Sequence, residues 1–356
     1  MRNFRYFYWA AFFTVVGLAM AAWLGFETTG TWRGAASVFV ICGVLAILEI
    51  SLSFDNAIIN ATVLEEMTPK WQRRFLTWGI LIAVFGMRII FPLVIVAVAA
   101  HINPFAALQL AIYHPDQYAH IMHGSRIAID AFGGTFLMMV GLEYFFDANK
   151  EVHWIAALER RLVRCASLKG IEVGVVLALV LLFCHFLPEG RASTFAFSAI
   201  YGLLTFLAVE AIGRLLDASQ SRMDAVHRGG LGAFLYLEML DASFSFDGVI
   251  GAFALSTNLF VIAIGLGIGA FYVRSLTIML VEKKTLGEYR FLEHGAFYAI
   301  LVLAVIMYAQ TMLEIPEVMT GLVGAVLIVL ALFSSIRYNR QCAACGDDQP
   351  AKISNG

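Results

Sequence analysis

Residues 49–58 read EISLSFDNAI, and residues 241–250 read DASFSFDGVI. Both segments have an acid first, serines at the third and fifth positions, then Phe-Asp, then Asn or Gly, an apolar residue and Ile. The segments that follow also match, because an arginine lies nine residues after a glycine in each, which gives Arg88 and Arg274. Agreement over ten positions and a following arginine indicates an internal duplication.

The composition around these segments is that of a membrane protein. Hydrophobic residues make up 60% of the chain and charged residues 14%, and the mean hydropathy is +0.80. Soluble domains are roughly 45–50% apolar and about 25% charged. The apolar residues form runs of about 20, the length that crosses a bilayer as a helix. We therefore predict an all-α polytopic membrane protein with about ten transmembrane helices.

The ten predicted helices are 7–26, 35–61, 75–100, 126–146, 171–188, 194–215, 229–255, 258–281, 296–314 and 317–336. No soluble domain is evident, so the bilayer is the main partner. A net charge of -2 and the absence of a basic patch argue against nucleic acid.

Charge in the loops predicts the orientation. Lys and Arg gather in 62–74, 147–170, 216–228, 282–295 and the C-terminal tail, whereas the alternate loop 256–257 has none. The positive-inside rule then places both termini in the cytoplasm, and we expect a bacterial inner membrane. Ala19-Met20-Ala21 could also end a cleavable signal peptide, but ten retained helices fit the charge pattern.

The two motifs lie five helices apart, so they cross the membrane in opposite directions. This predicts an inverted-topology repeat, which places a site near the midplane, where the two halves meet. The predicted organisation is an N-terminal helix with its connecting loop (1–34), a first repeat (35–216), a second repeat (217–336) and a polar tail (337–356).

The motif acids are costly at membrane depth. Each carboxylate costs roughly 2.5–3.5 kcal/mol at a helix centre, so Glu49, Asp55, Asp241 and Asp247 need a counter-charge, a proton or a bound ion.

The motifs also contain residues that favour a break in each helix. Asn56 and Gly248 accept left-handed backbone angles, and the motif serines can bond the backbone groups that a break would free. Carbonyl, carboxylate and amide oxygens together suit hard divalent cations such as Mg²⁺, Ca²⁺ and Mn²⁺.

Arg88 and Arg274 are the expected charge-balancing residues. Four motif acids and two arginines leave two negative charges, which one divalent cation would neutralise. The alternative is a pair of structural Asp–Arg contacts, one in each repeat. Asp130, Glu210 and Glu238 also fall in predicted helices and are candidates for proton coupling, as is Glu143.

Histidines and cysteines give weaker signals. His101, His114, His120 and His123 fall in a loop predicted outside the membrane; a metal-capturing vestibule is one interpretation, a solvated polar loop the other. Cys342 and Cys345 form a single C-x-x-C in the tail, and one such pair cannot fill a tetrahedral zinc site alone.

The motifs resemble those of the TerC family of bacterial membrane proteins. The resemblance rests on Glu49, Leu52, Ser53, Asp55 and Asn56, and on Ser245, Asp247 and Gly248. It implies inverted repeats and metal-ion handling, including manganese efflux and a link to tellurite resistance. It also implies Asp55, Asn56 and Asp247 as ion ligands, with Glu49 and Asp241 beside them. Gly248 stands where other members often have Ser.

The expected function is export of divalent cations, with Mn²⁺ as the first candidate substrate and no tightly bound cofactor. Two alternatives remain at this stage. The protein could be an intramembrane aspartyl protease that uses Asp55 and Asp247, although neither has the sequence context of such a dyad. It could also be a membrane scaffold that assists metal delivery or protein insertion. We expect a transporter rather than an enzyme.

Overall fold

The structure is a computed structural model that describes residues 4–79, 81–147, 150, 152–165, 170–220, 230–313 and 315–344. Every regular element in these ranges is helical, and eight of the helices found there are long and apolar enough to cross a membrane. The predicted all-α polytopic membrane fold is confirmed.

The chain begins with a helical hairpin. A short 3₁₀ turn, η1 (Phe4–Phe7), leads into α1 (Tyr8–Thr29), and α2 (Trp32–Leu52) returns alongside it. Gly30 makes the connection in the left-handed region, with φ of 64°, which a glycine adopts without steric cost. The Thr31 hydroxyl then accepts a 3.1 Å hydrogen bond from the Gly34 N–H and caps α2.

The segment after α2 is irregular. The predicted helix 35–61 divides into α2 and α3 (Phe54–Glu66), and α4 (Pro69–Arg74) follows. The predicted helix 75–100 contains two π-helical stretches, η2 (Phe75–Gly79) and η3 (Ile82–Ile90), before α5 (Phe91–Ala99). π-Helical turns are rare and occur frequently at functional sites.

Two loops of the prediction contain helices. The histidine-containing loop forms α6 (Pro104–Tyr113) and α7 (Pro115–Gly124). This segment is not a fully solvated loop, because apolar side chains such as Tyr118 and Met122 are buried and pack α7 against the bundle. The 147–170 loop contains α9 (Ala156–Cys165), after α8 (Arg126–Phe145).

The remaining elements are α10 (Ile171–Phe186), α11 (Glu189–Gln220), α12 (Leu231–Ala252), α13 (Leu259–Glu282), α14 (Thr285–Glu288), α15 (Leu292–Gln310) and α16 (Glu317–Ala344). Two of the ten predicted spans, α10 and α12, are not among the eight long apolar helices. α10 has only 16 residues, and α12 carries three acids. α16 continues through residues 337–344, past the predicted end of the last helix at 336.

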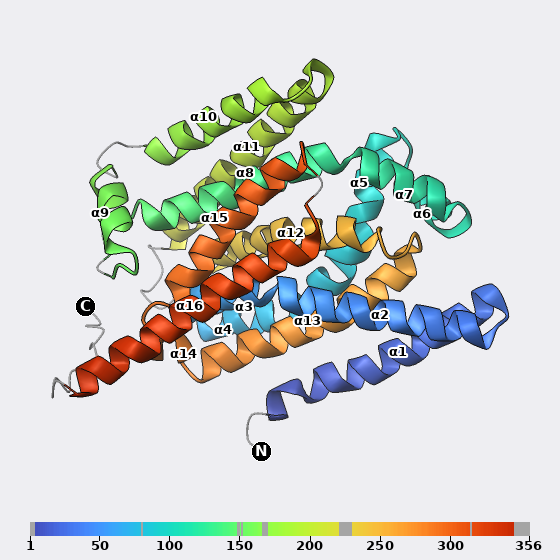
Figure 1. Ribbon diagram of the computed structural model, residues 1–356, viewed down its shortest axis with the longest axis horizontal. Helices are drawn as coiled ribbons and strands as arrows, with labels where there is room; N and C mark the ends of the chain where they lie inside the picture. The colour runs from blue at the N-terminus through green and yellow to red at the C-terminus, as the bar shows by residue number, and fades with distance from the viewer. Residues whose placement is uncertain are drawn as a thin grey trace.

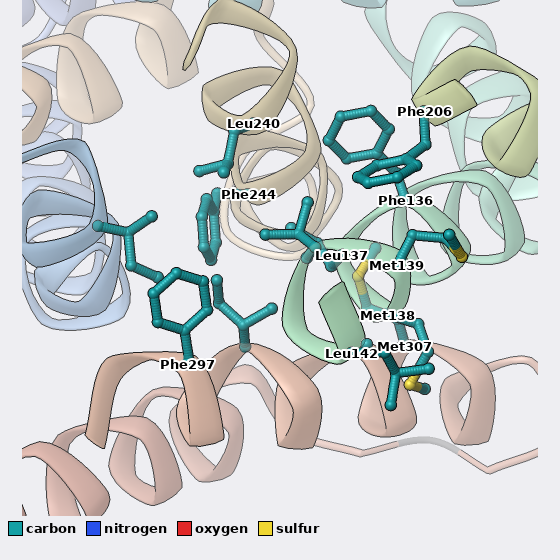
Figure 2. Close-up of a cluster of buried hydrophobic side chains, with 14 of the residues drawn as sticks. Phe136, Leu137, Met138, Met139, Leu142, Phe206, Leu240, Phe244, Phe297 and Met307 are labelled. Carbon is teal, nitrogen blue, oxygen red and sulfur yellow. The ribbon is translucent and has the colours of Figure 1, made fainter. Parts of the chain in front are cut away.

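The apolar core lies around α8. Figure 2 shows Leu137 and Phe136 of α8 between Phe244 of α12, Phe206 of α11 and Phe297 of α15. Close approach of α8 and α15 needs small residues: a Cβ on Gly141 would lie 2.5 Å from the Leu301 side chain. Small residues of this kind are typical of helix contacts in membranes.

The connections gather at two opposite ends of the bundle. The α6–α7 pair and the turn between α1 and α2 lie at one end, on the right in Figure 1, whereas α9 and the end of α16 lie on the left. The left end carries basic residues of α9 and α16, such as Arg160 and Arg337.

Candidate functional site

The two motif helices lie against each other in opposite directions. The Asn60 Nδ2 of α3 donates a 2.7 Å hydrogen bond to the Asp241 Oδ1 of α12. At the other end, a Cβ added to Gly248 of α12 would lie 3.3 Å from the Glu49 Oε2 of α2. Residue numbers therefore rise along α2 and α3 while they fall along α12. The duplicated segments run antiparallel and meet side by side, as we predicted.

Only the first motif helix is broken, and the break is at Ser53. Ser53 has φ of -102° and ψ of 18°, and its N–H donates to the Glu49 carbonyl before α3 begins at Phe54. The predicted breaks at Asn56 and Gly248 were wrong, because Asn56 is helical within α3 and α12 continues through Gly248 to Ala252. Gly248 instead permits the close approach of the Glu49 carboxylate.

A small polar cavity, which we call the Asp241 cavity, lies between the two repeats. Its polar lining is Glu49, Ser53, Asn56, Asn60, Arg88, Asp241, Ser245, Arg274 and Thr277. The volume open to the centre of a water-sized sphere is about 40 Å³. One water needs roughly 10–15 Å³ on this measure, so the cavity has room for a small ion with one or two waters.

Both predicted arginines reach this cavity. Arg88 forms a buried ion pair with Glu49, and a second guanidinium nitrogen donates to the Ala83 carbonyl. Arg274 interacts electrostatically with Asp241 and Glu238, and it donates a 3.3 Å hydrogen bond to the Phe75 carbonyl. Each repeat thus places its own arginine beside its own first motif acid.

Three buried oxygens beside Asp241 have no hydrogen-bond partner. They are the Oδ1 atoms of Asn56 and Asn60 and the Oγ of Ser245. The exposed fractions of these residues are 7%, 4% and 7%. Buried polar atoms are nearly always satisfied in folded proteins, so a group of three unsatisfied oxygens at one cavity indicates a place for a ligand.

A second cavity, the Asp55 cavity, lies next to the first. Its volume on the same measure is about 30 Å³, and it shares Glu49, Ser53 and Phe244 with the first cavity. Asp55 lines it and is 6% exposed. The Oδ1 of Asp55 accepts a 2.9 Å hydrogen bond from the Asn56 N–H. The adjacent α3 residues Asp55 and Asn56 thus line two different cavities.

The other predicted acids have different positions. The Asp247 side chain lies outside the described part of the chain. Glu238 is 7% exposed and neighbours the Asp241 cavity, packed against Gly79. Asp130 is fully buried in α8, where its Oδ2 lies 3.4 Å from the Arg126 Nε. Neither Glu238 nor Asp130 lines a motif cavity.

Glu210 lines a different surface depression. It pairs with Arg214 on α11, and together with Glu143 and Glu172 it lines a broad polar depression among α8, α10, α11 and α12. This depression is separate from the two motif cavities. The Cys342 side chain and Cys345 lie outside what the structure describes.

No group of three or more His, Cys, Asp or Glu side chains converges within the described residues in a metal-binding arrangement. The Asp241 cavity therefore offers a mixed set of oxygens, in which amides and a hydroxyl supplement the Asp241 carboxylate. Asn60 and Ser245 were not among the predicted ligands. Asn60 could have been found, because it lies one helical turn after Asn56 and so shares its face.

Sequence reasoning also missed a buried cluster around Glu159 of α9. The Glu159 carboxylate accepts hydrogen bonds from the Ile155 N–H at 3.0 Å and from the Tyr298 hydroxyl at 3.1 Å. Lys150 and His294 lie 3.5 Å from its Oε2. No sequence pattern identifies this cluster, because its members come from a loop and from α15.

These contacts shift the ionisation of the loop residues. Burial alone would raise the pKa of Glu159, but the Ile155 N–H and the charge of Lys150 outweigh it and hold that pKa below its usual value. Burial lowers the pKa of Lys150 to about 8, and Glu159 opposes this shift. The cluster links α9 to α15 through the contacts of Glu159 with Tyr298 and His294. It is remote in sequence from the motifs.

Comparison with known proteins adds a family. Residues 54–342 match the family described as "Protein of unknown function (DUF475)". The chain belongs to this family. The match begins at α3 and runs to α16, so it includes Asp55, Asn56, Asn60 and the whole second motif. No curated protein and no solved structure matches the chain.

Proposed function

We propose that the protein exports divalent cations across a membrane, with Mn²⁺ as the first candidate, and that the Asp241 cavity is the substrate site. The observation that carries this proposal is the meeting of Asn56, Asn60 and Ser245, each with an unpartnered oxygen, around Asp241. Oxygen donors of this kind suit Mg²⁺, Ca²⁺ and Mn²⁺. The resemblance of the motifs to the TerC family favours manganese among them.

The electrostatics of the cavity support a cation. The Asp241 carboxylate is held by the Asn60 amide nitrogen, so a bound cation would replace that donor. The Asn60 and Asn56 oxygens have no hydrogen bond to lose, and rotation of either amide would direct its oxygen towards the ion. Arg88 pairs with Glu49 and Arg274 interacts with Asp241, so the two arginines compensate the acids when no cation is bound.

The antiparallel arrangement supports a transport role. Inverted repeats that meet at a midplane site can open that site alternately to the two sides when one repeat moves against the other. The basic loops predict that both termini are cytoplasmic in a bacterial inner membrane. An exported cation would then enter from the end of the bundle that contains α9.

A transport assay tests the proposal. Purified full-length protein in liposomes should carry Mn²⁺ to a fluorescent chelator on the far side, and Asp241→Asn should abolish this flux. Ser334→Ala is the matched control, because Ser334 is partly exposed on α16 and its hydroxyl bonds only its own helix.

Cells lacking the protein should likewise become sensitive to excess Mn²⁺. Wild type and Ser334→Ala should restore growth, whereas Asp241→Asn at equal membrane expression should not. Wild-type liposomes without Mn²⁺ flux would contradict the proposal.

A further inference from the structure

We propose that the Asp55 cavity is a separate binding site for a monovalent cation, Na⁺, beside the substrate cavity. Its role as a coupling site rests on the proposed transport function, whereas the binding itself does not. The geometry that carries the proposal is the convergence of three kinds of oxygen: the Asp55 carboxylate, the Thr320 hydroxyl and the carbonyl end of α2.

The carboxylate has no cationic partner. Among the described residues, no basic side chain forms an ion pair with Asp55, and its recorded hydrogen bonds come from the backbone. In the Asp241 cavity, by contrast, Arg88 and Arg274 compensate the acids. A buried carboxylate without compensation is costly, and a single positive charge would neutralise this one.

Thr320 provides an independent observation. It lies on α16, far along the sequence from the motifs, and lines the Asp55 cavity. Thr320 is 6% exposed, and its Oγ1 has no hydrogen-bond partner in the described structure. A buried hydroxyl is rarely left in this state. α16 comes close enough because Gly321 and Gly324 leave room, with a Cβ on Gly324 lying 3.7 Å from the Asp55 Oδ2.

The break at Ser53 supplies further oxygens. α2 ends at Leu52 and α3 begins at Phe54, so the carbonyls of residues 50–52 lack the amide partners of a continuous helix. The Asn56 N–H donates to the Asp55 carboxylate instead. Helix ends of this kind carry partial negative charge, and the carbonyl ends of interrupted helices coordinate Na⁺ in transporters.

A bound cation accounts for the cavity better than a proton does. A proton would occupy only the carboxylate and would leave the Thr320 hydroxyl and the α2 carbonyls unsatisfied. The cavity volume of about 30 Å³ exceeds the roughly 10–15 Å³ that one water needs, so it has room for one dehydrated ion.

Melting of the purified full-length protein in detergent tests this site. NaCl should raise the melting temperature of wild type above the value in KCl at equal ionic strength. Thr320→Val keeps the shape but removes the oxygen, and it should raise the half-saturating Na⁺ concentration by about tenfold or more. Ser334→Ala, on the same helix, should respond as wild type does.

Mn²⁺ separates the two proposals. Thr320→Val should keep the stabilisation by MnCl₂, whereas Asp241→Asn should lose it and still respond to Na⁺. A Na⁺ response with no Mn²⁺ response would overturn the substrate assignment and leave the Asp55 site standing. Absence of a Na⁺-specific shift in wild type, or an unchanged Na⁺ response in Thr320→Val, would overturn the Asp55 site.

Discussion

Removal of Arg88 should destabilise the protein more than removal of any exposed arginine. Arg88 and Glu49 are 5% and 4% exposed and form a direct ion pair. Arg88→Met keeps most of the side-chain volume but leaves the Glu49 carboxylate buried and unpaired. Breaking a buried pair by loss of one partner costs about 3–5 kcal/mol, so we expect a loss of stability of that order.

The double variant provides the decisive comparison. Replacement of a whole buried ion pair by uncharged groups is often close to neutral, so Arg88→Met with Glu49→Gln should be more stable than Arg88→Met alone. Glu49→Gln alone should cost less than Arg88→Met, because Asp241 still lies within the electrostatic reach of Arg88. These variants form a thermodynamic cycle that isolates the pair.

Reversible unfolding of the full-length protein in mixed micelles measures these differences. Arg214→Met is the control, because Arg214 pairs with Glu210 while its side chain is 78% exposed. An exposed pair contributes about 0–1 kcal/mol, so this variant should unfold nearly as wild type does. Equal losses for Arg88→Met and Arg214→Met, or strictly additive losses in the cycle, would refute the reasoning.

Two further perturbations follow from the packing and from the loop cluster. Gly269→Ala should lower the free energy of unfolding by about 1–3 kcal/mol, because the added Cβ would lie 2.4 Å from the Glu49 Cβ. Gly267→Ala is the control, because its added Cβ makes only an ordinary 3.5 Å contact. Equal melting temperatures for the two variants would contradict this. The Glu159 pKa is lowered in the folded protein, so its contribution to stability is present above the usual value of 4.5 and is lost as the pH falls through the lowered value. Limited proteolysis of residues 150–165 should therefore accelerate in acid for wild type, and Glu159→Gln should be cleaved readily even near neutral pH; protection of that variant equal to wild type would show that the carboxylate does not hold α9.

The sequence predicted the features that depend on composition and on the repeat. Apolar runs identified the helices, because a bilayer demands about 20 apolar residues in a helical span. The duplicated motif predicted that the two motif helices run antiparallel and approach each other, and the structure joins α3 to α12 through Asn60 and Asp241. The paired arginines predicted that the charge of the motif acids is compensated, and Arg88 forms an ion pair with Glu49.

The details that tertiary packing decides were beyond the sequence. A left-handed preference at Asn56 did not locate the break, because the helix is interrupted at Ser53, which has φ of -102°. Gly248 has the same preference, yet α12 packs tightly enough to continue through it. Thr320 belongs to no motif, and only the approach of α16 brings it to the Asp55 cavity.

Binding of Mn²⁺ to the purified full-length protein, measured by titration calorimetry, tests the central claim most directly. We predict one saturable site in wild type and in Ser334→Ala. Asn60→Ala should weaken binding by about tenfold, because it removes one oxygen beside the ion, and Asp241→Asn should weaken it further, because a hard dication depends most on the lost charge. Wild-type affinity in Asp241→Asn, or no saturable binding in wild type, would contradict the assignment of the Asp241 cavity as a divalent-cation site.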